Sequence, residues 1–170
     1  SGIEVNTFWD LGMDDSTTIW FIQSIGREHR VIDYYEATGE GLPHYAKILK
    51  EKPYVYGEHF MPHDAAVREL GTGKSRRDTA EELGIRPVKI VKRAKDAQAV
   101  RNGIEAGRNI FSQCWFDEKK CAQGLSGLEG YHFEYDEENK KLKDTLSHTW
   151  HSHASDGWRT FAVGYQPRII

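Results

Sequence analysis

Hydrophobic and polar positions in the first third of the chain predict strands and one helix. β-prone residues form three runs, at residues 5–9, 17–25 and 29–35. A short polar turn that contains Gly26 joins the last two runs, which predicts a hairpin. Apolar positions spaced i, i+3, i+4, i+7 predict a helix over residues 42–49, which ends before Pro53. A further strand is expected at residues 54–60. The predicted order is therefore strand, strand, strand, helix, strand.

Helical spacing dominates the second half. We expect three helices, at residues 76–83, 95–110 and 116–125, and one short strand at residues 88–91. An acidic turn between two short β-prone runs predicts an exposed hairpin or linker at residues 131–143. A last helix contains Trp158 and Tyr165 on one face, and Ser152 is placed to cap it. The largest aromatic residues are expected in the core: Trp9, Trp20, Phe21, Tyr34, Trp115, Trp158 and Phe161.

Length and composition favour one domain with one core. The chain has 170 residues, of which 38% are apolar and 29% charged, and its mean hydropathy is −0.68. No run approaches the roughly 18 apolar residues of a membrane helix, and the first residues do not resemble a signal peptide. Cys114 and Cys121 are too few for a disulfide framework and lack the spacing of a zinc ribbon. We therefore expect reduced thiols and a cytosolic setting, with no membrane partner.

The net charge of −3 argues at first against binding to nucleic acid. The charges are unevenly placed, however. Residues 68–101 carry ten basic and five acidic side chains, a net +5, so the remainder carries −8. A total of this kind conceals a basic face beside a carboxylate-rich one.

Three aspartates fall at the ends of predicted elements. Asp10 ends the first strand, Asp64 follows the fourth, and Asp156 lies in the first turn of the last helix. If the two strands are neighbours, both carboxylates project from one edge of the sheet, and converging carboxylates need divalent cations such as Mg²⁺ or Mn²⁺ between them. Each aspartate also has a local explanation as a turn former or helix cap, so spacing alone does not establish a metal site.

Four segments of the sequence together resemble a known family. They are TFWDLGMDDSTTIW at residues 7–20, MPHDA at 61–65, ELGTGKSRR at 69–77 and HSHASDGWR at 151–159. In this order and at these spacings they are similar to the C-terminal nuclease domain of the large terminase subunit of tailed bacteriophages. The resemblance covers nearly the whole chain. It implies an α/β fold of the ribonuclease H-like (retroviral integrase-like) class, with a central mixed β-sheet flanked by helices.

The resemblance also implies an activity: a metal-dependent endonuclease that cuts concatemeric double-stranded phage DNA with little sequence specificity during genome packaging. The acidic triad of the family falls on Asp10, Asp64 and Asp156, which would bind two Mg²⁺ or Mn²⁺ ions. A further acidic residue of the family falls on Asp14 or Asp15, of which Asp15 is favoured. One departure is Gly157, where the family pattern would have a small apolar residue.

Partners follow from the same resemblance. Residues 1–170 are expected to form a single nuclease domain without the packaging ATPase domain that precedes it in the full-length chain. The expected partners are duplex DNA, that ATPase domain, the small terminase subunit and the portal protein, with the chain in the host cytoplasm and transiently at the procapsid portal. The residues expected to contact DNA come from the basic stretch and the predicted hairpin: Lys74, Arg76, Arg77, Lys89, Lys92, Arg93, Lys140 and Lys141.

Other interpretations compete with this one. The segment GTGKS at residues 71–75 is similar to a phosphate-binding loop, but the position that needs its first glycine is Arg68. His148, His151, His153 and Asp156 invite a zinc site; we expect His151 and His153 instead to support the acidic site. Two further alternatives keep the fold: a DNA- or portal-docking module with weak or no cleavage, and a resolvase-like nuclease that acts on branched DNA.

Overall fold

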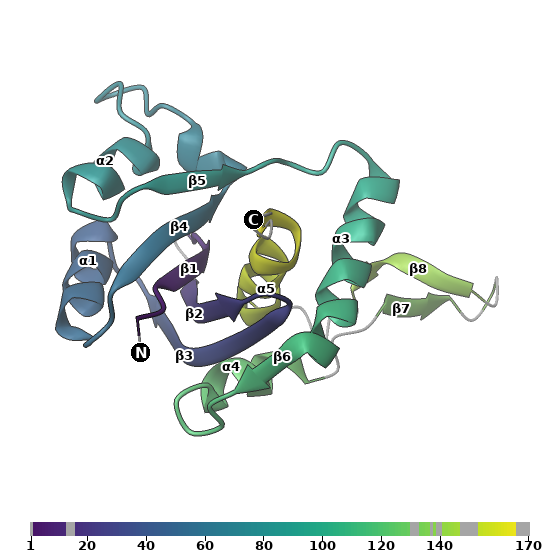
Figure 1. Ribbon diagram of the computed structural model, residues 1–170. Coiled ribbons are helices and arrows are strands. Elements are labelled where there is room, and N and C mark those ends of the chain that lie inside the picture. The colour runs from purple at the N-terminus through teal and green to yellow at the C-terminus, as the bar shows by residue number, and fades with distance from the viewer. Residues whose placement is uncertain are drawn as a thin grey trace.

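One mixed sheet of six strands organises the molecule (Figure 1). The computed structural model describes residues 2–12, 16–129, 133–136, 138, 141–146 and 153–165. The strands lie in the order β5-β4-β1-β2-β3-β6, with the bounds β1 Val5–Asp10, β2 Ser16–Ile25, β3 Glu28–Thr38, β4 Tyr56–Pro62, β5 Val88–Val91 and β6 Cys114–Phe116. β4 is parallel to both β1 and β5, and β2 is antiparallel to its neighbours β1 and β3. The ends of β1 and β4 therefore reach the same edge of the sheet, which meets the condition under which Asp10 and Asp64 were expected to share that edge.

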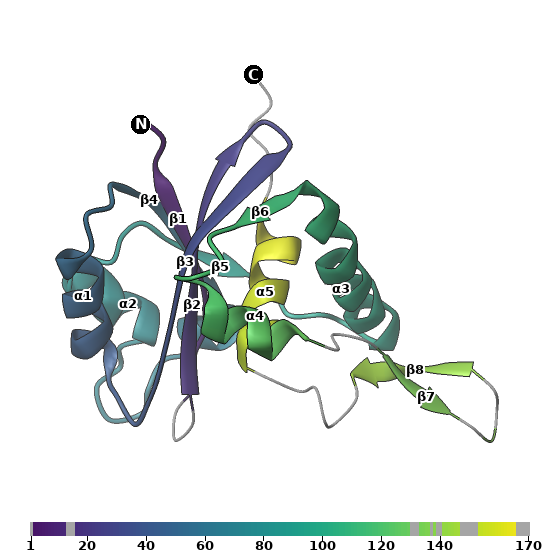
Figure 2. The ribbon, with the colours of Figure 1, turned by 90° about the horizontal axis from the view of Figure 1, so that it is seen from below.

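Helices cover both faces of this sheet (Figure 2). One face, which we call the α1/α2 face, carries α1 (Leu42–Glu51) and α2 (Arg76–Glu82). The other, the α5 face, carries α3 (Ala97–Asn109), α4 (Ala122–Leu128) and α5 (His153–Gly164). Because side chains alternate along a strand, β1 sends Trp9 into the first core and Phe8 into the second. The expected α/β sheet flanked by helices is confirmed.

The first turn of α5 is fixed against β2 by hydrogen bonds. Thr18 Oγ1 donates to the carbonyl oxygen of His153 at 2.9 Å, and Trp20 Nε1 donates to that of Ala154 at 2.9 Å. At Gly157 a Cβ atom would lie 2.9 Å from Thr18 Oγ1. The glycine that departs from the expected small apolar residue thus lets the helix approach the sheet closely, and this approach places the neighbouring acidic residue, Asp156.

The largest errors of the sequence-based prediction lie between residues 110 and 125. The helix predicted at 116–125 starts too early and ends too early, because Phe116 ends β6 and α4 spans Ala122–Leu128. Between them Asp117 accepts hydrogen bonds from the backbone N–H groups of Lys119 and Lys120, which forms a turn. A strand of three residues is too short to show a period of two, so β6 was missed.

Trp115 is not a core residue. It lies on the edge strand β6 and is 69% exposed, whereas its neighbours Cys114 and Phe116 pack into the core of the α5 face. Alternation turns Trp115 to the opposite side, where the α1/α2 layer does not extend across the sheet to β6. The other six large aromatics are buried as predicted.

Short elements complete the chain. The 3-10 helices η1 (His63–Ala66) and η2 (Ile110–Gln113) follow β4 and α3, and two strands, β7 (Phe133–Asp136) and β8 (Lys141–Leu146), pair antiparallel in a separate two-stranded sheet that projects beyond α3 (Figure 2). β8 runs three residues past the predicted hairpin at 131–143. Ser152, the predicted cap of α5, lies outside the described residues. No helix in the described part of the chain is long and apolar enough to cross a membrane.

Candidate active site

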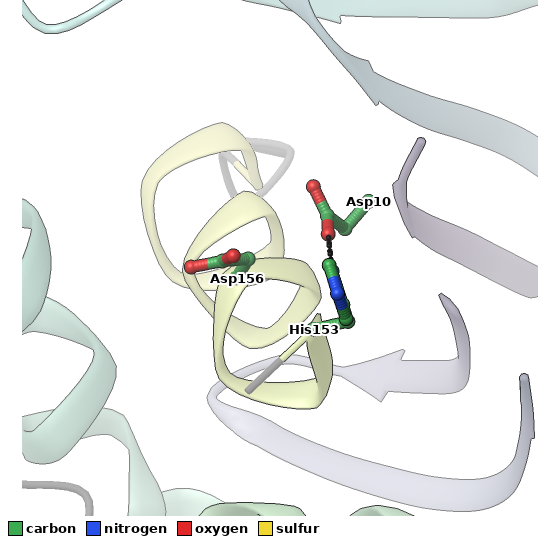
Figure 3. A group of neighbouring side chains, drawn as sticks. All are labelled: Asp10, His153 and Asp156. Atoms are coloured by element: carbon green, nitrogen blue, oxygen red, sulfur yellow. Dashed lines mark hydrogen bonds and ion pairs between the residues drawn. The ribbon is translucent and has the colours of Figure 1, made fainter. Parts of the chain in front are cut away.

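Three predicted site residues meet where β1 ends beside the first turns of α5 (Figure 3). Asp10, His153 and Asp156 each offer one ligand atom, and these atoms all lie within 4.8 Å of one another. His153 Nδ1 lies 3.1 Å from Asp10 Oδ2, the contact drawn in Figure 3. His153 and Asp156 are three residues apart on α5, a spacing that puts both on one side of the helix.

Asp10 is in an environment that penalises its negative charge. The pKa of Asp10 is raised from 3.8 to about 6, chiefly by burial and next by the charge of Asp156; the contact with His153 opposes this rise, and the charge of Asp64 adds a little to it. A carboxylate held in such surroundings gains from a nearby cation. The site is therefore suited to bind positive charge.

Asp64 lies in η1, directly after β4, the strand that pairs with β1. Its Oδ2 accepts a hydrogen bond from Arg76 Nη2 at 3.2 Å. Its Oδ1 is buried and has no hydrogen-bond partner, and within the described residues it is the one buried side-chain N or O atom of which this is true. A buried, unpaired carboxylate oxygen costs free energy unless a further group binds it, and a metal ion is such a group.

The donor atoms fit a divalent transition-metal ion. Ligands about 2.1 Å from an octahedral ion lie up to about 4.2 Å apart, so the group formed by Asp10, His153 and Asp156 has to contract by only a fraction of an ångström. Oxygen donors suit Mg²⁺ and Mn²⁺, whereas an imidazole is a ligand of transition metals rather than of Mg²⁺. The sequence predicted an oxygen-only triad and gave His153 a supporting position. The structure places His153 within the ligand group and leaves Asp64 outside it, on η1, where its charge still acts on Asp10.

Asp156 has a cationic partner of its own. The guanidinium group of Arg159, one turn further along α5, donates a hydrogen bond to Asp156 Oδ1, and the two side chains are 27% and 19% exposed respectively. Each of the three aspartates thus contacts one basic side chain: Asp10 contacts His153, Asp64 contacts Arg76, and Asp156 contacts Arg159.

A cavity of about 630 Å³ opens from the site between α5, α3 and residues 91–95. Its polar lining combines acidic and basic side chains: Asp10, Asp156, Arg159, Lys92, Arg93 and Lys95. Within the described part of the chain, the structure shows no ion pair for the last three. Two of the predicted DNA-binding residues, Lys92 and Arg93, therefore border the acidic site with their charge available for an anion.

Four other predicted DNA-binding residues, all within the described part of the chain, lie close to carboxylates. Lys74 binds Glu82 at 2.9 Å, Arg77 binds Glu81 at 3.3 Å and Lys89 lies 3.6 Å from Glu58; Arg76 binds Asp64, as described above. Counting charges along the sequence did not separate these residues from Lys92 and Arg93. The structure also gives the GTGKS segment a local role, because Ser75 caps α2 in a capping box with Asp78.

Several predicted residues lie outside the described part of the chain. Asp15, Lys140, His148 and His151 belong to this group, and Lys141 begins β8. Arg159 is a site residue that the sequence analysis missed, whereas Lys95 belongs to the basic stretch that was expected to hold DNA. The sequence did contain a signal for Arg159 that was not used: a basic residue three positions after a predicted ligand lies on the same face of the last helix.

The sheet order, the two helical layers and the acidic edge define a ribonuclease H-like α/β domain. Its fold is that of solved large terminase nuclease domains. The nuclease domain of the large terminase g2p of bacteriophage SPP1, solved with bound Mn, aligns with a TM-score of 0.64 and 14% identity over 92% of this chain and 84% of that one. The nuclease of the thermophilic phage G20c, solved with bound cobalt, aligns with a TM-score of 0.61 and 12% identity over 96% and 81%.

Longer terminases show the same likeness. The large terminase of another thermophilic bacteriophage, solved in complex with ADP, aligns with a TM-score of 0.65 and 15% identity, over 94% of this chain and 39% of its own length. The chain thus spans about two fifths of that protein. No protein-family model and no curated protein sequence matches the chain. The resemblance drawn from the sequence is confirmed at the level of the fold.

Proposed function

We propose that this domain is a metal-dependent endonuclease of a viral DNA-packaging motor, and that it hydrolyses phosphodiester bonds of duplex DNA with little sequence specificity. The observation that carries the proposal is the convergence of Asp10, His153 and Asp156. The buried, unpaired Oδ1 of Asp64, at the end of the neighbouring strand, adds to it. The fold shared with terminase nucleases solved with Mn and with cobalt supports it.

Each residue of the site has a distinct task. Asp10, His153 and Asp156 would hold one divalent ion, for which the imidazole favours Mn²⁺ over Mg²⁺. Asp64 would help to hold a second, Mn²⁺ or Mg²⁺, with Asp15 as a further candidate ligand. Divalent ions so held supply a water of lowered pKa and stabilise negative charge on the phosphate. Asp10 would help to hold both ions, because it ends β1, which pairs with the strand that leads to Asp64, and because it lies beside His153 and Asp156 of α5.

The cationic wall of the cavity supplies the binding surface for the DNA backbone. Lys92, Arg93 and Lys95 face the acidic cluster across the cavity, so a phosphate bound by them would lie next to the metal ligands. Residues 1–170 would then form one nuclease domain whose partners are duplex DNA, the packaging ATPase domain of a longer chain, the small terminase subunit and the portal protein. The domain would work in the host cytoplasm and at the procapsid portal.

The test is nicking of supercoiled plasmid in Mn²⁺. We expect Asp10→Asn and Asp64→Asn each to lower the rate at least about 100-fold, because each removes a charged ligand and with it several kcal/mol of transition-state stabilisation. Glu51→Gln is the matched control, since it removes a carboxylate from α1 on the opposite face of the sheet. Full activity in both aspartate variants would refute the proposal.

Two other outcomes would redirect it. Tight binding of duplex DNA without cleavage in any divalent metal would indicate a docking module. Faster cleavage of a four-way junction than of a linear or nicked duplex would indicate a nuclease of branched DNA. Running the three substrates side by side therefore separates all three activities.

A further inference from the structure

Arg159 lies where the acidic cluster meets the cationic cavity. Its guanidinium group binds Asp156 and also lines the cavity with Lys92, Arg93 and Lys95. The backbone on both sides is fixed: Trp158 Nε1 donates to the carbonyl oxygen of Gly107 at 2.8 Å, and Thr160 Oγ1 donates to that of Trp9 at 3.0 Å. Any movement of Arg159 is therefore a movement of its side chain between Asp156 and the cavity.

Two cations compete for the same carboxylate. Asp156 belongs to the ligand group with Asp10 and His153, yet its Oδ1 is engaged by Arg159. A divalent ion in that group would neutralise Asp156 and repel the positive guanidinium group beside it. The released side chain would then face a cavity in which the anion available to it is a phosphate of bound DNA, which a planar guanidinium group can bind through two parallel hydrogen bonds.

We infer that Arg159 is a phosphate-binding catalytic residue, held by Asp156 in the metal-free protein and transferred to a substrate phosphate when a divalent ion binds. The inference rests on the proposed function. It predicts that metal binding and DNA binding are positively cooperative, because the ion frees the Arg159 side chain, which then contacts the DNA. Arg159 thereby keeps the acidic cluster neutralised in the absence of metal and becomes part of the binding surface in its presence.

Arg76 provides the contrast. It binds Oδ2 of Asp64 and leaves Oδ1 unpaired, so a metal ion can bind Asp64 without displacing it. Arg76 is only 18% exposed and is not among the residues that line the cavity. We therefore assign the transfer to Arg159 alone.

The experiment compares Arg159→Gln and Arg159→Lys with the wild type. The matched control is Lys47→Gln, which removes one cation from an exposed i,i+4 ion pair on α1, away from the site. Three quantities are measured: the affinity for Mn²⁺ without DNA by calorimetry, the affinity for a labelled duplex with and without Mn²⁺ by fluorescence anisotropy on ice, and the rate of plasmid nicking. Circular dichroism checks that every variant is folded.

The expected pattern is opposite for metal and for DNA. Arg159→Gln should bind Mn²⁺ about threefold to fivefold more tightly, since a competing ion pair is gone. It should lose most of the gain in duplex affinity that Mn²⁺ produces in the wild type, and nick about 10- to 100-fold more slowly. Arg159→Lys keeps the charge but not the planar fork, so it should retain part of the Mn²⁺-dependent gain and cleave slowly. Lys47→Gln should match the wild type.

Other results would overturn the inference. Tighter Mn²⁺ binding with an unchanged duplex gain would mean that Arg159 only neutralises Asp156, and weaker Mn²⁺ binding would mean that it positions Asp156 as a ligand. If the wild type does not cleave, the proposed nuclease function fails, but the anisotropy measurement still decides: loss of the Mn²⁺-dependent gain in Arg159→Gln supports the inference. Persistence of that gain, or its absence from the wild type, refutes it.

Discussion

Strands β1 and β4 place a titratable side chain on each face of the sheet, and the surroundings of these two side chains differ. On the α1/α2 face, His59 of β4 is 2% exposed, its Nδ1 lies 2.6 Å from Thr7 Oγ1, and Thr7 Oγ1 accepts a hydrogen bond from Trp9 Nε1 at 2.6 Å. On the α5 face, Asp10 of β1 lies among charged side chains beside an open cavity. Burial lowers the pKa of His59 to about 4, whereas burial together with neighbouring charges, chiefly that of Asp156, raises the pKa of Asp10 to about 6.

The difference shows how one layer serves stability and the other chemistry. On the α1/α2 face, buried His59 is neutral at pH 7 and contacts the hydroxyl group of Thr7, which in turn accepts a hydrogen bond from the indole of Trp9. The α5 face keeps a carboxylate in a position where burial opposes its charge, and this cost is offset when a cation binds. The cations follow the same division, since Lys74, Arg76 and Arg77 of the α2 region are ion-paired, whereas Lys92, Arg93 and Lys95 border the cavity.

His59 should give the largest effect in this comparison. Its folded pKa of about 4 is below its ordinary value of 6.5, so between these pH values the unfolded chain binds the proton and the folded chain does not. The stability of the wild type relative to His59→Gln should therefore rise by about 3 kcal/mol from pH 4 to pH 6.5. Urea denaturation at half-unit pH steps measures this difference. Parallel curves for the two proteins would show that His59 does not titrate in this way.

Asp10 should give a smaller effect of opposite sign. Its pKa is raised from 3.8 to about 6 in a setting formed by His153 and Asp156 of α5 and by Asp64 after β4, so between these values the folded chain binds the proton more tightly. In EDTA, the stability of the wild type relative to Asp10→Asn should fall by about 2 kcal/mol from pH 4 to pH 6. The same denaturation series tests it, and a difference that rises with pH would contradict the assignment.

Much of the acidic site was predictable because it depends on where strands end. Asp10 and Asp64 follow apolar runs, and the parallel pairing of β1 with β4 brings them to one edge. Asp156 required the family resemblance, since no local pattern ties the last helix to that edge. The contacts of Thr18 and Trp20 with the first turn of α5, which place Asp156, join residues more than 130 positions apart.

The ion-pair partners of the basic residues could not be predicted from the sequence. Lys74 and Lys92 both belong to the basic stretch, yet Lys74 binds a glutamate eight residues away while Lys92 lines the cavity. Arg76, which was expected to bind DNA, is ion-paired with Asp64. Such pairings depend on how α2 and residues 91–95 pack against the sheet, which a count of charges along the chain does not contain.

The smallest expected effect is on duplex affinity, and it compares the basic residues that line the cavity with the ion-paired basic residues at α2. We expect Lys92→Gln with Arg93→Gln to lower duplex affinity about tenfold near 0.1 M salt and to reduce the slope of log affinity against log salt by nearly 2, because two phosphate contacts are lost. The matched pair, Lys74→Gln with Arg77→Gln, removes cations that are already neutralised by Glu82 and Glu81, and should change affinity less than about twofold. Fluorescence anisotropy over a salt series measures both. Equal losses in the two double variants would mean that the ion pairs of α2 open to bind DNA, and the division between the two faces would then hold for the buried groups alone.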